Sequence, residues 1–123
     1  MHDPRSTVRA FFDHINRKDL AGLAQLAPPS FAEPVTLLAT AFPDIAYTLT
    51  DLIAEGDRVA VRWSWTGTHA RQFRDFAPTN RRFTNTGMAI FTVAGGKITA
   101  VAMETDRLGF QDQARHFGQE GAA

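Results

Sequence analysis

Because the chain contains no cysteine, we expect its acid–base chemistry to rely on carboxylates and imidazoles. That absence excludes disulfides, thiolate nucleophiles and thiolate zinc sites together. Glu104 and Asp106 alternate along a predicted strand, so they share one face, where two carboxylates could hold a single proton. Alternatively, Glu104 is a solvated edge residue or a partner of Arg62 or Arg82. Asp106 could instead cap a turn or a helix.

Histidine supplies the other candidate for proton chemistry. His69 ends a predicted strand on the face that also carries Trp63 and Trp65, where its imidazole could donate to a substrate carbonyl or orient a water. An equally open alternative places His69 on the rim of the fold, at the start of loop 70–81. The four histidines show no i, i+4 pair or other ligand spacing, so we expect no metal site; the other three are His2, His14 and His116.

Aromatic and amide side chains on the same strand faces are candidate substrate contacts. Trp63 and Trp65 share the face of His69, which favours the cavity, although such tryptophans are more often core or subunit-interface residues. Asn85 and Phe91 share a face of the next strand, where Asn85 could bond a substrate carbonyl or, as readily, a backbone group. The chain holds ten phenylalanines and one tyrosine, more apolar aromatic surface than so small a core requires. This excess predicts an apolar cavity.

Four arginines surround the predicted loop 70–81, which also contains Phe73 and Phe76. They could form a lid that attracts an anionic or phenolate substrate. A solvated loop explains the same pattern without any ligand, and this alternative stays open. The four are Arg71, Arg74, Arg81 and Arg82.

The elements that would position these residues begin with helices. Residues 6–27 show apolar positions three and four apart, with Asp19 capping a second short helix in this stretch. A further helix is expected after Pro34, a favourable first-turn residue. The glutamine-rich tail after Gly109 is expected to fray.

From residue 45 onward the apolar residues alternate with period two, which is typical of strands. The predicted strands cover residues 45–52, 58–69, 82–93 and 97–106. Helices followed by an antiparallel meander predict an α+β fold. We expect a curved sheet with the helices packed on its concave face, and a ligand cavity between the two layers.

The composition is that of an ordinary soluble domain. The 123 residues fit one domain, 1–123, at roughly 100–200 residues per domain. Thirteen basic residues balance thirteen acidic ones, which disfavours a nucleic-acid binder. No apolar run approaches the ~18 residues that span a bilayer, and residues 1–5 lack a signal-peptide pattern. We therefore expect a cytoplasmic protein without nucleic-acid or membrane partners.

Several short segments, taken in order, resemble one known family. They are Ala41–Ile45, Asp51–Arg62, Thr66–His69, Ala77–Asn80, Gly96–Ile98 and Asp106–Phe110. Together they resemble the SnoaL-like polyketide cyclases. That family belongs to the wider nuclear-transport-factor-2-like superfamily, which also contains ketosteroid isomerase and limonene epoxide hydrolase. The resemblance implies the superfamily's cone-shaped fold, with a curved, mostly antiparallel sheet.

Ring-closing members of that family use one aspartate as general acid and base, at the position that matches Asp106. The resemblance therefore implies a cofactor-independent enzyme of the lyase or isomerase type in natural-product biosynthesis. It would cyclise a hydrophobic polyketide-like substrate by intramolecular aldol attack, or isomerise it, with Asp106 as proton shuttle. His69 and Asn85 are candidate donors to the enolate oxygen. A homodimer is also implied, because a second copy commonly covers the exposed sheet face of this fold.

The sequence departs from the family pattern at three places. Segment 29–34 holds no histidine or asparagine of the kind that the family often places in its pocket, and Ala89 stands where many members have His or Asp, two residues before Phe91. Ala102 occupies a strand that is often rich in tryptophan. Because Ala102 shares a face with Asp106, we expect a wider and less polar pocket. Two alternatives therefore stay open: a non-catalytic domain that binds an apolar ligand or a partner, and an epoxide or ester hydrolase.

Overall fold

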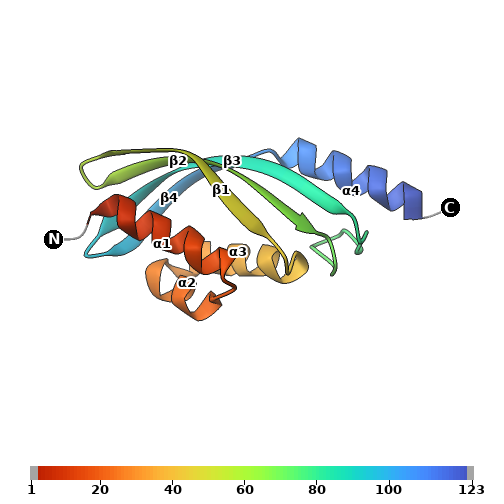
Figure 1. The fold of residues 1–123 in the computed structure, drawn as a ribbon, viewed down its shortest axis with the longest axis horizontal. Coiled ribbons are helices and arrows are strands. Elements are labelled where there is room, and N and C mark those ends of the chain that lie inside the picture. The colour runs from red at the N-terminus through yellow and green to blue at the C-terminus, as the bar shows by residue number, and fades with distance from the viewer. Residues whose placement is uncertain (1–2, 122–123) are drawn as a thin grey trace.

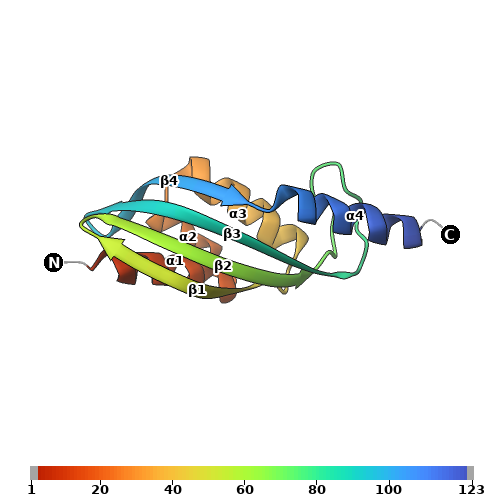
Figure 2. The same cartoon turned by 90° about the horizontal axis from the view of Figure 1, so that it is seen from above.

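The computed structural model describes residues 3–121 and shows a curved sheet with three helices against its concave face (Figure 1). The strands run antiparallel in the order β1-β2-β3-β4, with bounds β1 Ala46–Glu55, β2 Arg58–Thr68, β3 Arg82–Ala94 and β4 Lys97–Thr105. The helix α4 extends past the end of the sheet (Figure 2). The helices are α1 Pro4–Asn16, α2 Leu20–Leu26, α3 Pro29–Ala41 and α4 Arg107–Gly121. The predicted α+β class is confirmed.

The sheet forms because apolar residues alternate along its strands, and because tight turns join β1 to β2 and β3 to β4. Gly56 and Gly95 lie in these two turns at φ 59°, a left-handed conformation that favours glycine. Alternate positions of β2 and β3 are buried against the helices. The large side chains on this inner face are Val59, Val61, Trp63, Trp65, Phe83, Phe91 and Val93.

Strand β4 contains a bulge that decides which side chains face inward. Val93 pairs with Ile98, but Thr92 pairs with Ala100, so Thr99 is an extra residue in the ladder. One extra residue reverses the side that every later side chain faces. The sequence prediction assumed uninterrupted alternation from residue 97 to 106. It therefore placed the side chains at the end of β4 on the wrong faces of the sheet.

Helix α3 begins at Pro29, so the predicted start after Pro34 is wrong. Pro29 occupies the first turn, where its missing N–H has no intrahelical partner to lose. Phe31 then stacks on Phe11 of α1, with ring centroids 5.2 Å apart. We attribute the early start to this packing, which outweighs the single hydrogen bond that Pro34 cannot make inside the helix.

The tail after Gly109 that was expected to fray continues helix α4, so that prediction is wrong for residues 110–121; residues 122–123 lie outside the described part of the chain. Phe110 and Ala114 are buried on one face of the helix, and Phe110 packs on Phe83 with centroids 5.3 Å apart. Gln113 also bonds both backbone groups of Thr84: it accepts from the N–H at 3.0 Å and donates to the carbonyl at 2.8 Å. Apolar packing and these two bonds together fix α4 on the end of β3.

Candidate functional site

An inner cavity of about 350 Å³ lies between α3, the concave face of the sheet, the loop 70–81 and the start of α4. The loop lies beside α4 (Figure 2). Phe73 and Phe76 of the loop both pack on Phe110, with ring centroids 5.5 and 5.9 Å apart. The aromatic residues of the lining are Phe31, Tyr47, Trp63, Trp65, Phe73, Phe76 and Phe110. A cavity of this size and composition suits an apolar small molecule.

Trp63 and Trp65 form part of the cavity wall, on the inner face of β2. Both side chains are almost fully buried. Trp63 lies against Gly87 of β3 so closely that a β carbon at this glycine would come within 2.5 Å of the indole Cζ2 atom. Phe42 packs edge-on against Trp65 with centroids 5.1 Å apart. Glycine at position 87 therefore makes room for the indole.

Tyr47, the only tyrosine, lines the same cavity and was missed by the sequence reasoning. Its backbone is fixed by the side chain of Asn16, which accepts from the Tyr47 N–H at 2.7 Å and donates to the Tyr47 carbonyl at 3.0 Å. Burial raises the pKa of the Tyr47 phenol, so the hydroxyl stays protonated and can donate. The available signal was its alternation with Leu49, which places it on the inner face of β1.

The charged side chains that line the cavity are both arginines: Arg74 from the loop and Arg107 from the first turn of α4. Ser30, Thr105 and Gln111 add hydroxyl and amide groups. No lining residue carries a carboxylate. The cavity can therefore stabilise negative charge on a ligand, but it offers no carboxylate base. Of the four arginines considered as a lid, Arg74 is the one that lines the cavity.

Asp106, predicted to face the cavity, does not line it, and this placement is wrong. Its carboxylate accepts a hydrogen bond from the Gly109 N–H at 2.9 Å and caps the first turn of α4, with the side chain exposed. Both sequence neighbours, Thr105 and Arg107, do line the cavity. The capping alternative is confirmed. Asp106 fixes the helix end that carries the cavity residues Arg107 and Phe110.

Ala102 and Glu104 lie on the outer, convex face of the sheet, so their predicted place in the pocket is wrong. The bulge at Thr99 is the cause, because it turns these two side chains outward. They border an outer groove of about 700 Å³. Arg62 on this face pairs with Asp51 at 2.6 Å, so no described ion pair joins it to Glu104. The exposed hydrophobic residues on this outer face are Ile53, Met88 and Ile90.

The predicted homodimer stays a prediction. The outer groove is the surface that would serve it, because it exposes large apolar side chains. None of the helices within residues 3–121 covers this face of the sheet (Figure 1). Ile53 is 69% exposed there, and Met88 is 52% exposed.

His69 is fully buried, so the alternative of a rim histidine is wrong. Its ring stacks on Phe42, with centroids 5.0 Å apart, and meets Phe83 edge-on at 5.2 Å. Nδ1 lies 3.3 Å from the Thr79 hydroxyl, while Nε2 is buried without a hydrogen-bond partner. Burial lowers the pKa of the imidazole, although the nearby backbone of Arg71 opposes the shift. His69 is thus a neutral member of the aromatic core and does not line the inner cavity.

Asn85 and Phe91 also fall outside the lining of the inner cavity. Phe91 is fully buried and packs on Phe11 and Phe12 of α1, at 6.1 and 6.0 Å. Asn85 is buried opposite Trp65, with its Oδ1 atom unpaired. The structure therefore brings together Trp63 and Trp65 from the predicted substrate contacts and Arg74 from the predicted lid, and it adds Tyr47 and Arg107.

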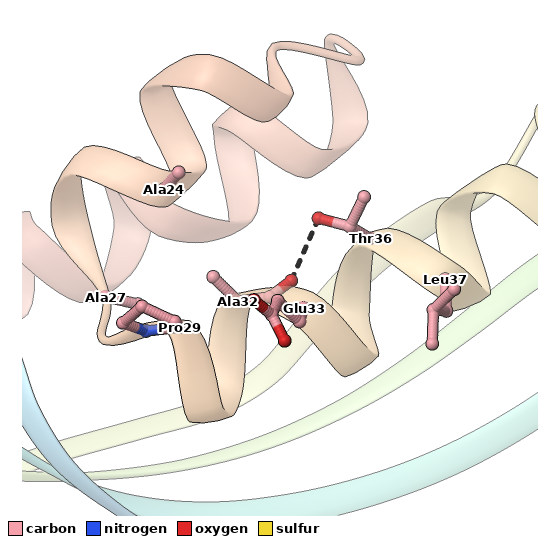
Figure 3. Close-up of a pocket in the computed structure, with 7 residues that line it drawn as sticks. All are labelled: Ala24, Ala27, Pro29, Ala32, Glu33, Thr36 and Leu37. Atoms are coloured by element: carbon pink, nitrogen blue, oxygen red, sulfur yellow. Dashed lines mark hydrogen bonds between the residues drawn. The ribbon is translucent and has the colours of Figure 1, made fainter.

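A second depression, of about 440 Å³, lies between α2 and α3 (Figure 3). Small side chains line most of it, with Leu37 exposed and Glu33 as the lone charge. Within residues 3–121, no three histidine or acidic side chains gather where they could hold a metal ion. None of the helices in this range is long and apolar enough to cross a membrane.

Solved structures share this fold over nearly the whole chain. AclR from Streptomyces galilaeus, a proposed hydroxylase, superposes with a TM-score of 0.82 at 20% identity, covering 92% of this chain and 96% of its own. A proposed polyketide cyclase from Acidithiobacillus ferrooxidans gives 0.77 at 24% identity, covering 92% and 94%. IdmH from Streptomyces antibioticus, also a proposed polyketide cyclase, gives 0.75 at 24% identity, covering 91% and 98%.

At these identities the structural matches show the fold alone, and the predicted nuclear-transport-factor-2-like cone is confirmed. No curated protein matches the chain. The family model for SnoaL-like polyketide cyclases matches residues 5–114, a range that includes α1 apart from Pro4, the helices α2 and α3, the whole sheet and every residue of the cavity lining. The chain therefore belongs to the SnoaL-like polyketide cyclase family.

Proposed function

We propose that this chain is a cofactor-independent enzyme of the cyclase type that binds an apolar, polyketide-like molecule in the inner cavity. The observation that carries the proposal is the aromatic cavity of about 350 Å³ in a chain of this family. Cavities lined by aromatic side chains, with a few convergent polar groups, are the usual sites for small apolar ligands.

The reaction that fits best is an intramolecular aldol closure. A proton leaves a carbon next to a carbonyl, the resulting enolate carbon bonds to a second carbonyl carbon of the same molecule, and that carbonyl oxygen takes up a proton. Tyr47, Arg74 and Arg107 are the donors that would stabilise the enolate oxygen. Because no carboxylate lines the cavity, hydroxide from the solvent, attracted by the exposed Arg74 and Arg107, would accept the first proton and become water. Water would then protonate the new alkoxide, which regenerates hydroxide. Isomerisation would use the same enolate without forming a carbon–carbon bond.

Asp106 takes a different part in this proposal from the proton shuttle that the resemblance implied. Its carboxylate is engaged with the Gly109 N–H, so it acts through α4 and positions Arg107. To reach a bound substrate it would have to give up that cap, which is worth about 0.5–2 kcal/mol in a typical helix. Asp106 is therefore a positioning residue here.

A non-catalytic binding domain is the second candidate. The absence of a carboxylate from the cavity lining favours it, since proton transfer at carbon usually relies on a positioned base. Such a domain would bind the same apolar ligands in the same cavity and return them unchanged.

The test combines a panel of aromatic polyketide intermediates with one variant that blocks the cavity. Val35→Trp adds an indole to a half-buried lining position of α3. Leu37→Trp is the matched control, because Leu37 lies on the same helix and is 62% exposed. It borders the depression between α2 and α3 (Figure 3) and does not line the inner cavity. Product formation is followed by absorbance and mass, and ligand binding by calorimetry.

We expect wild type and Leu37→Trp to convert at least one intermediate, and Val35→Trp to lose conversion by tenfold or more while remaining folded. If wild type binds an intermediate without converting it, and Val35→Trp abolishes this binding, the chain is a non-catalytic binding domain instead. Conversion that Val35→Trp leaves unchanged would contradict the inner cavity as the site.

A further inference from the structure

We infer that the inner cavity selects aromatic ligands that carry an anionic group, bound between Arg74 and Arg107. This inference rests on the proposed function, because it assigns a substrate class to the same cavity. Both arginines line the cavity, one on the loop side and one on the α4 side. They are the lining residues that carry formal charge.

Arg74 is presented by a tight turn of the loop 70–81. Phe73 and Phe76 bond each other through both backbone groups, at 3.0 and 2.9 Å, so Arg74 and Asp75 form the tip. Arg74 adopts the left-handed conformation, with φ 52°, and the Gln72 side chain donates to its carbonyl at 3.0 Å. Such a backbone is unfavourable for a residue with a β carbon, so the surrounding contacts must hold it.

The guanidinium of Arg74 lies over the ring of Phe73, with Cζ 5.2 Å from the centroid. Phe73 in turn packs on Phe110, so the cation is attached to the cavity wall rather than to a free loop. The adjacent Asp75 does not line the cavity. The turn therefore directs a positive charge, and not a negative one, to the cavity.

Arg107 supplies the second charge from a position that α4 fixes. It follows the cap residue Asp106 directly and begins the helix. The ion pairs found within residues 3–121 join Arg5 to Asp3, His14 to Asp19 and Arg62 to Asp51. Neither Arg74 nor Arg107 takes part in any of these pairs.

Two cations beside an apolar wall, without a carboxylate in the lining, attract an anion more strongly than the same charges do in open water. Guanidinium groups also match the geometry of carboxylates. The aromatic wall contributes the remaining binding energy through contact with a flat ring system. The ligand class is therefore a fused aromatic body with a carboxylate or comparable oxyanion at the mouth.

The experiment compares two probes that differ in charge, 2-naphthoate and its neutral relative 2-naphthamide, by calorimetry at 50 and 500 mM NaCl. We expect wild type to bind naphthoate about tenfold more tightly at low salt, which corresponds to about 1.4 kcal/mol. High salt should weaken naphthoate alone. The double variant Arg74→Gln/Arg107→Gln should bind both probes equally.

Arg71→Gln is the matched control, because Arg71 belongs to the same loop and does not line the cavity. It should keep the preference for naphthoate. Equal binding of the two probes by wild type, no binding of naphthoate at millimolar concentration, or a preference that survives the double variant would each overturn the inference. Circular dichroism verifies that every variant is folded.

Val35→Trp separates this inference from the proposed function. If wild type binds both probes equally and Val35→Trp abolishes both, the cavity stands as a site while its anion selectivity is refuted. If Val35→Trp leaves the binding of both probes unchanged, the cavity itself is refuted as the site, and the proposed function fails with it.

Discussion

The inner cavity and the outer groove lie on opposite faces of the same sheet, and their side chains differ in kind. The inner cavity is lined by aromatic side chains and two arginines. The outer groove is lined mainly by aliphatic and methionine side chains, with Glu104 and the ion pair of Asp51 and Arg62. The difference shows that a carboxylate near the end of β4 belongs to the outer surface, so the cavity works with cations and donors.

One residue of β4 produces this separation. Without the extra Thr99, the alternation that buries Ile98 would also turn Ala102 and Glu104 toward the helices. With it, Met103 and Thr105 line the cavity instead. The chemistry available to the site therefore depends on strand register as much as on residue type.

The largest expected effect is on the free energy of unfolding, and it compares a buried side chain on the inner face with an exposed one on the outer face. Phe42→Ala should lower the free energy of unfolding by about 3–5 kcal/mol, because the fully buried ring contacts Trp65, His69 and Phe83. Ile53→Ala on the outer face should cost less than about 1 kcal/mol, since that side chain is 69% exposed. Urea unfolding measures both. Similar losses in the two variants would mean that the outer face is covered in solution.

A smaller effect is expected where the inner face has no spare room. Gly87→Ala should cost about 1–3 kcal/mol, because its new methyl group would overlap the indole of Trp63. Gly118→Ala is the control, since a β carbon there meets open space and alanine favours a helix. Adding Trp63→Phe to Gly87→Ala should recover part of the loss. Without such recovery, the cost would arise from the backbone of β3.

The inner face of the central strands could be predicted from the sequence because alternation is unbroken there. Trp63, Trp65 and Phe91 all lie on the side that parity assigned to them. The start of α2 could also be predicted from the sequence, because Asp19 was expected to cap it. The Asp19 carboxylate does accept a hydrogen bond from the Gly22 N–H at 2.9 Å. Strand alternation and helix capping could therefore be predicted from the sequence, because both depend on residues that are close together in the chain.

The rest depended on contacts between distant segments. The β4 bulge depends on pairing with β3, so no local pattern marked it. Helix α4 was missed because Phe110 gains its burial from Phe83, in another element. The phenylalanine excess was only partly a cavity signal. Every phenylalanine contacts another ring, but the ones that line the cavity are Phe31, Phe73, Phe76 and Phe110.

A pair of substitutions at Asp106 sharpens the division between the two faces. Asp106→Ala removes the α4 cap and should cost about 1 kcal/mol, whereas Asp106→Asn keeps a capping oxygen and should cost a few tenths. Cavity binding and any conversion should follow the same order, with Asn close to wild type. An Asn variant that is as stable as wild type but as inactive as Ala would show that the carboxylate moves a proton, and would overturn the positioning role.

The smallest expected effect concerns the titration of His69. Its pKa in the folded protein is below the ordinary value of 6.5, because burial disfavours the charged ring. As the pH falls below about 6.5, the unfolded chain therefore binds this proton first, and the free energy of unfolding declines until the folded pKa is passed. Above about 6.5 the full stability is present.

His69→Phe should remove this part of the decline in the free energy of unfolding between pH 7.5 and pH 5. Urea unfolding of wild type and of the variant at each pH measures the difference. The titration of Asp44 does not contribute to the decline between pH 7.5 and pH 5. Hydrogen bonds from Thr68 lower the pKa of its carboxyl, so its contribution is lost only below its ordinary value of 3.8. Equal slopes in wild type and His69→Phe would show that the imidazole is not held neutral by the core. The inner face would then be more hydrated than the packing of Phe42 and Phe83 around the ring implies.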